Sequence, residues 1–153
     1  MLKKSWILIL LVLLFGCTTI SEKAIDLSDT KSFTIHEVTI DKSISKDDLI
    51  SKLKGKLDYN SSKTLDSKED LKMLNDFVDS LKENDNGLSF PMAIHNVYEL
   101  VLCNQNVKEK YFILDYDSDS VKPELIIVDQ DTQSTRVFFG EVKQLNLIKE
   151  SLK

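Results

Sequence analysis

Residues 92–139 read MAIHNVYELVLC-NQNVKE-KYFILDY-DSDSVKP-ELIIV-DQDTQ-STRVFF, with apolar segments separated by short polar ones. Within the apolar segments, large side chains tend to alternate with polar ones, a period of two that is typical of strands. In the first segment this alternation puts Ile94, Tyr98, Leu100 and Leu102 on one face. Successive strands with short polar turns are usually antiparallel neighbours, so the stretch predicts a meander of about four strands.

Upstream of this stretch, the sequence predicts one more strand. Residues 32–40, SFTIHEVTI, are rich in β-branched and aromatic side chains. Phe33 and Ile35 point one way while Val38 and Ile40 point the other. We therefore expect either a bulge or a strand that is buried on both faces.

Three helices complete the expected fold. Ser45 and Ser67 each precede a carboxylate by three residues and begin apolar runs at helical spacing, which predicts capped helices over 45–57 and 67–81. Residues 141–152 have the same spacing. We expect an α+β fold of one domain, residues 32–153, whose antiparallel sheet contains the first strand and the meander, with about three helices packed mainly on one face.

The chain begins MLKKSWILILLVLLFGC, with two lysines ahead of an unbroken apolar run. This run is too short to cross a bilayer as a helix, which needs about 20 residues. The segment resembles the signal peptide of bacterial lipoproteins, and Leu14-Phe15-Gly16-Cys17 resembles their lipobox. The resemblance implies that residues 1–16 are removed and that lipid on Cys17 anchors the protein at the extracytoplasmic face of the cell membrane. An uncleaved anchor or an ordinary secretory signal is the alternative, and either would also export the domain.

Residues 18–31 contain mostly polar side chains with no sustained period. We expect Cys17 and these residues, 17–31, to form a flexible tether that keeps the domain within roughly 20 Å of the membrane. The alternative is that Ile25 and Leu27 begin the first strand or pack on the domain.

Charge and cysteine content limit the possible partners. The formal net charge is −5, and removal of residues 1–16, which contain two lysines and no acidic residue, gives −5 − 2 = −7. Such a surface repels phosphates, so we expect no nucleic acid partner, and we ascribe membrane binding to the lipid on Cys17. Cys103 is the other cysteine, so lipidation of Cys17 leaves no intramolecular disulfide.

One acidic motif has the spacing of a metal site. Asp115-x-Asp117-x-Asp119 has the oxygen spacing that opens an EF-hand loop. Ser120 stands where that loop needs glycine, however, and Ile126 stands where it needs glutamate. We therefore expect a solvated turn and no metal.

Other candidates for a chemical site are few. His36 and His95 lie in predicted strands without metal-ligand spacing, so we expect surface or hydrogen-bonded histidines. Cys103 lies in an apolar strand, where packing is its expected role. No nucleophile motif or phosphate-binding loop is present, so we expect neither a catalytic residue nor a cofactor.

Aromatic side chains concentrate in the predicted sheet. We expect them to pack in the core, and a partner-binding aromatic patch is the alternative. These residues are Tyr98, Tyr111, Phe112, Tyr116, Phe138 and Phe139.

In size and order of elements, the domain is similar to small lipoproteins of Gram-positive bacteria. We expect a non-enzymatic protein-interaction domain at the outer face of the membrane, and an immunity or exclusion lipoprotein is one specific version of this. The alternatives are a small-molecule or ion-binding lipoprotein and, ranked last, an enzyme that uses scattered carboxylates or Cys103.

The first prediction concerns the anchor. Cys17→Ser should abolish palmitate labelling and detergent partitioning and leave an unprocessed precursor, because no thiol remains at the cleavage point. Cys103→Ser is the matched control and should change neither property. Labelling that survives in Cys17→Ser would show that the anchor is assigned wrongly.

Overall fold

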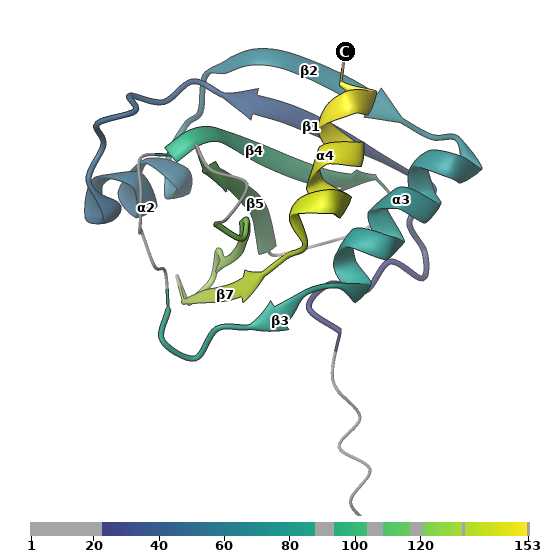
Figure 1. Cartoon of the computed structure of the whole chain (residues 1–153). Helices are drawn as coiled ribbons and strands as arrows, with labels where there is room; N and C mark the ends of the chain where they lie inside the picture. Colours follow the sequence, from purple (N-terminus) through teal and green to yellow (C-terminus); the bar gives the residue numbers. More distant parts are fainter. Residues whose placement is uncertain (1–22, 88–93, 104–108, 117–120, 133, 153) are drawn as a thin grey trace, which may run out of the picture.

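The computed structural model describes residues 23–87, 94–103, 109–116, 121–132 and 134–152 (Figure 1). Its helices and strands are, in chain order, β1 Ser32–Val38, α2 Lys46–Lys54, β2 Tyr59–Leu65, α3 Lys68–Asp79, β3 Lys82–Glu83, β4 Ile94–Cys103, β5 Glu109–Tyr116, β6 Glu124–Asp129, β7 Thr135–Phe139 and α4 Val142–Ser151. Within these ranges, no helix is both long and apolar enough to cross a membrane. The predicted α+β class is confirmed.

All strands belong to one antiparallel sheet, in the order β2-β1-β4-β5-β6-β7-β3. The predicted meander is confirmed, because β4 to β7 are consecutive neighbours. The sheet is larger than predicted, with seven strands within the described residues, since β2 and β3 were not expected. These two strands form the opposite edges of the sheet.

Strand β2 was not predicted, because apolar and polar residues do not alternate in its sequence, YNSSKTL. Six of its residues are exposed and only Leu65 is buried. Its pairing with β1 over residues far apart in the chain makes it a strand.

The sheet is covered on both faces. Helices α3 and α4 pack on one face through side chains such as Leu74, Phe77 and Leu145. Helix α2 packs on the other face through Leu49 and Leu53. The expectation of helices mainly on one face therefore holds for two of the three, while α2 covers a second core.

A bulge corrects the predicted face of Ile94. The pairing of β4 with β5 is irregular between Ile94 and Asn96. Ile94 consequently packs with Val97 in the α2 core, whereas Tyr98 packs in the α3/α4 core. An extra residue reverses the alternation of a strand, which a regular period of two cannot reveal.

Strand β1 contributes buried side chains to both faces of the sheet, in line with one of the two interpretations, although Thr34 and His36 are only half-buried. Phe33 and Ile35 pack in the α3/α4 core, and Val38 packs in the α2 core. Its pairing with β4 is regular from Ser32 to Val38. The bulge lies instead in β2, where Asn60 is the extra residue between Ser61, opposite Glu37, and Tyr59, opposite Val38.

The expected tether is wrong from Ala24 onward. Ala24 and Ile25 are buried in the α3/α4 core, and Leu27 packs against it. The alternative, in which Ile25 and Leu27 pack on the domain, is the arrangement found. Full burial of one isoleucine side chain contributes about 1.5–3 kcal/mol, enough to hold a short segment in place. Residues 17–22 lie outside the described ranges.

Helix α3 begins at the predicted capping box. The Ser67 hydroxyl accepts from the Asp70 amide at 3.1 Å, and the Asp70 carboxylate accepts from the Ser67 amide at 3.2 Å. The fully buried Phe77 ring reaches Gly140, where a Cβ atom would lie 2.8 Å from Cε2 of the ring. Glycine at this position therefore allows α3 to approach the end of β7.

The second prediction concerns this packing. Phe77→Ala should lower the free energy of unfolding by about 3–5 kcal/mol, because it leaves a cavity in the α3/α4 core. Leu147→Ala is the control, since Leu147 is 42% exposed, and should change stability by less than about 1 kcal/mol. Denaturant titration would measure both values. An unchanged midpoint for Phe77→Ala would show that this face of α3 is not packed.

Candidate functional site

The open surface of the sheet beside α2 carries a row of polar side chains. Ser62, His36 and Glu99 are opposite one another across β2, β1 and β4. Opposite residues of an antiparallel ladder point to the same face. His36 is two residues from Val38, so the row lies on the α2 face.

Tyr59 reaches over this row, and we call Tyr59, Ser62, His36 and Glu99 the Tyr59 cluster. The Tyr59 ring stacks on His36 with centroids 4.4 Å apart and planes 26° apart. Nδ1 of His36 lies 2.6 Å from Oγ of Ser62. The Tyr59 hydroxyl donates a hydrogen bond to the Glu99 carboxylate.

Burial differs sharply within the Tyr59 cluster. Glu99 is buried at 7% exposure, whereas Tyr59 is 43% exposed. A buried carboxylate needs a hydrogen-bond partner, which the Tyr59 hydroxyl supplies. Desolvation, followed by the hydrogen bond and charge of Glu99, raises the pKa of Tyr59 to about 12. The phenol is therefore a donor near neutral pH and not a base.

The order serine, histidine, glutamate invites comparison with a nucleophilic triad. In a triad, the carboxylate bonds to the histidine nitrogen that faces away from the serine. Here the Glu99 carboxylate accepts from Tyr59 instead. Chemically, the arrangement presents a fixed aromatic plane with hydroxyl, imidazole and carboxylate groups beside it, which suits recognition better than acyl transfer.

Two further features extend this surface. Val101 is 40% exposed and lies on the same face, because it is opposite Thr34 in β1. The Thr34 hydroxyl is 2.9 Å from that of Thr64 in β2. Among the described residues, the exposed large hydrophobic side chains are those of Tyr59, Val101 and Leu147. Tyr59 belongs to the Tyr59 cluster, and Val101 borders it.

The aromatic residues of the predicted sheet pack in the core, as expected. All of them are buried except Phe139, which is half-buried. The partner-binding alternative therefore does not apply to them. The exposed tyrosine is Tyr59, and its only sequence signal is the run Tyr-Asn-Ser-Ser between two helices.

The predicted site residues do not come together. His36 is hydrogen-bonded, as expected, and His95 is half-buried in β4. Cys103 is a free, half-buried thiol at the end of β4. Cys17 lies outside the described residues, so its lipidation remains a prediction.

Asp115 has a structural role. It is 8% exposed, and its carboxylate pairs with Nζ of Lys149 at 2.7 Å, which ties β5 to α4. Asp117 and Asp119 lie outside the described residues. Within the described ranges, no three His, Cys, Asp or Glu residues gather as a metal site would require.

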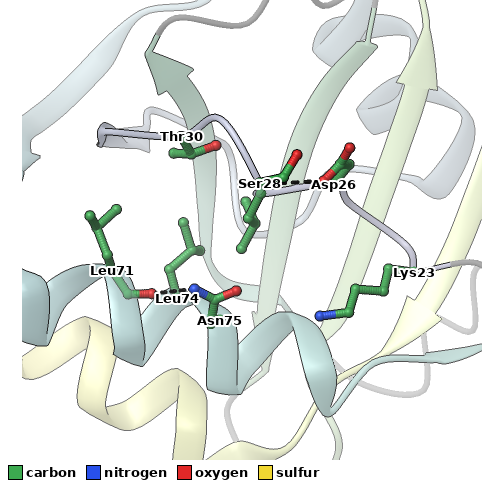
Figure 2. Close-up of a pocket in the computed structure, with 8 residues that line it drawn as sticks. Lys23, Asp26, Ser28, Thr30, Leu71, Leu74 and Asn75 are labelled. Atoms are coloured by element: carbon green, nitrogen blue, oxygen red, sulfur yellow. Dashed lines mark hydrogen bonds between the residues drawn. The ribbon is translucent and has the colours of Figure 1, made fainter.

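A cavity of about 440 Å³ lies between residues 23–30 and α3 (Figure 2). It is lined by Lys23, Asp26, Leu27, Ser28, Thr30, Leu71, Leu74 and Asn75. Backbone and side-chain hydrogen bonds from Ser28 hold the pKa of Asp26 below its ordinary value. Lys23 pairs with Asp79 at 2.8 Å. The cavity therefore combines leucine walls with charged and polar groups.

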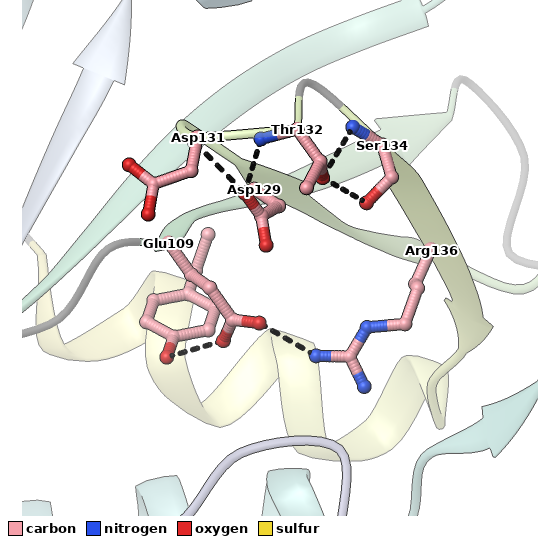
Figure 3. Close-up of polar contacts among 7 residues, drawn as sticks. Glu109, Asp129, Asp131, Thr132, Ser134 and Arg136 are labelled. Atoms are coloured by element: carbon pink, nitrogen blue, oxygen red, sulfur yellow. Dashed lines mark hydrogen bonds and ion pairs between the residues drawn. The ribbon is translucent and has the colours of Figure 1, made fainter.

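One group of polar contacts links β5 to β7, and a second lies within the β6–β7 turn (Figure 3). Glu109 accepts from Arg136 at 2.7 Å and from the Tyr111 hydroxyl at 3.1 Å. Asp129 Oδ1 accepts from the amides of Asp131 and Thr132, each at 2.8 Å. These bonds are internal to the domain, so we assign both groups a structural role.

Comparison with known proteins gives no assignment. No family model matches the sequence, no curated protein matches it, and no solved structure matches its fold. Inference about function therefore starts from the exposed residues of the sheet.

The third prediction concerns the Tyr59 phenol. Burial also raises the pKa of Tyr98 to about 12, so absorbance at 295 nm near pH 12 should report both phenols, and Tyr59→Phe should remove the contribution of Tyr59. Glu99→Gln should move the Tyr59 step to lower pH, because it removes the negative charge beside the phenol. Unfolded tyrosine ionises near pH 10, so the stability contributed by this group is complete below pH 10 and is lost between pH 10 and 12. A Tyr59 step near pH 10 in the native protein would contradict the bond to Glu99.

Proposed function

We propose that the protein is a lipoprotein, tethered through lipid on Cys17 to the extracytoplasmic face of the membrane, that binds a protein partner with the surface around the Tyr59 cluster. The observation that carries the proposal is the exposed Tyr59 ring, fixed by His36 and Glu99. Support for the anchor comes from the lipobox Leu14-Phe15-Gly16-Cys17.

The composition of this surface favours a protein partner. Tyrosine offers a large amphipathic contact area at low entropic cost, and serine and asparagine offer adaptable hydrogen bonds, as in antibody paratopes. Asn60 and Ser62 lie close to Tyr59 in the chain and are exposed. Val101 adds apolar area beside them. Buried aromatic anchors surrounded by polar contacts are the usual centres of binding energy.

A second candidate function is the binding of a small molecule. The 440 Å³ cavity beside α3 has a volume within the range of small-ligand sites. A ligand there would contact Asp26 and Asn75 against leucine walls. Leu71→Trp, which fills the cavity, would abolish such binding without touching the Tyr59 cluster.

The fourth prediction tests the partner. A photoreactive amino acid at position 101 of the full-length protein should give a discrete crosslinked adduct in intact cells, because this position borders the Tyr59 cluster. Tyr59→Ala in the same protein should remove the adduct by removing the aromatic anchor.

Leu147→Ala is the matched control, since Leu147 is similarly exposed but lies on α4. It should leave the adduct unchanged. No adduct from position 101, or an equal adduct in Tyr59→Ala, would count against the proposed function.

A further inference from the structure

We infer that the partner adds an extended, acidic segment to the sheet as a strand beside β2, with the Tyr59 cluster holding its side chains. This inference rests on the proposed interaction function and names the chemistry of its partner. Strand addition to a sheet edge takes affinity from backbone hydrogen bonds and specificity from pockets for alternate side chains.

The β2 edge has the form that such addition requires. Among the described strands, β2 ends the sheet, with β1 as its one neighbour. It is seven residues long, whereas β3 at the opposite edge has two. An edge strand presents a row of backbone groups without a ladder partner. Only β2 is therefore long enough to guide a second strand over several residues.

The two sides of β2 offer different contacts to an added strand. Ser62 and Thr64 point to the α2 face, where Tyr59 and His36 form the aromatic stack. Lys63 points to the other face, opposite Ile35, and its ammonium donates to the Ser151 carbonyl at the end of α4. Alternate side chains of an added strand would meet the aromatic stack on one face and Lys63 on the other.

Charge selects an acidic segment over a second copy of this chain. Lys63 is the one charged residue of β2, so a carboxylate is its complement. In an antiparallel pair of β2 strands centred on Ser62, Lys63 would be diagonal to Lys63 of the other copy. Like charges at that spacing are unfavourable, and the Asn60 bulge would interrupt the pair twice.

The described part of the chain begins far from this edge. Lys23 contacts Asp79 at the end of α3 that leads into β3, so the chain enters the domain far from β2 (Figure 1). Six strand spacings of about 4.8 Å separate β3 from β2 by roughly 29 Å.

Selection from a phage-displayed library of random dodecapeptides, on the full-length protein in detergent micelles, tests this inference. Peptides enriched on the wild type should carry Asp or Glu, and peptides enriched on Lys63→Glu should carry Lys or Arg in their place. The best wild-type peptide should slow amide hydrogen exchange at least tenfold in β2 and leave β3 unchanged.

Point variants measure the contribution of the Tyr59 side chain to peptide binding separately from that of the β2 edge. Tyr59→Ala should raise the Kd of that peptide at least tenfold, and Leu147→Ala should change it less than twofold. If Tyr59→Ala does not fold, Lys63→Glu still tests the inference. The Lys63 side chain is exposed, so reversing its charge should leave the fold intact.

Three results would overturn the inference. These are no enrichment, the same charge in both selections, and protection of amides outside β2. Protection of β2 that grows with protein concentration in the absence of peptide would also overturn it, in favour of a second copy. Any of these together with a Tyr59-dependent adduct at position 101 would reject strand addition while leaving the proposed function intact.

Discussion

The pairing of β1 with β4 is the constraint on which the rest of the fold depends. It joins Ser32–Val38 to the meander in an uninterrupted register, although about sixty residues separate the two strands. Through this ladder β2 becomes the sheet edge, and His36 comes to lie between Ser62 and Glu99. The candidate site is therefore a product of long-range pairing and not of any local motif.

The helices cover the two faces of the sheet unequally, and this difference leaves part of one face open. Helices α3 and α4 cover one face, but in the part of the chain that the structure describes only the nine-residue α2 covers the other. The α2 core is closed by Leu49 and Leu53, and the sheet continues beyond it through β1 to β2. Tyr59 and His36 cover part of that remainder with an aromatic stack instead of an aliphatic core.

Local signals predicted the parts of the fold that depend on local physics. The Ser67–Asp70 capping box marked α3, and short polar turns marked the meander. Tertiary pairing decided the rest. Nothing local makes YNSSKTL a strand, a bulge moved Ile94 to the other face, and packing ordered Ile25 in an otherwise polar segment. The Tyr59 cluster was hidden for the same reason, since its four residues come from three strands.

The Tyr59 side chain is held in place by contacts within the domain and is also exposed to solvent. Both properties favour its use in binding a partner. Its hydroxyl satisfies the buried Glu99 carboxylate, and its ring stacks on His36. Both contacts fix the side chain before any partner arrives. A side chain that is already ordered loses little rotamer entropy on association, so more of its contact energy appears as affinity. The cost of ordering Tyr59 is met by folding, because Glu99 would otherwise lie buried without this hydrogen bond.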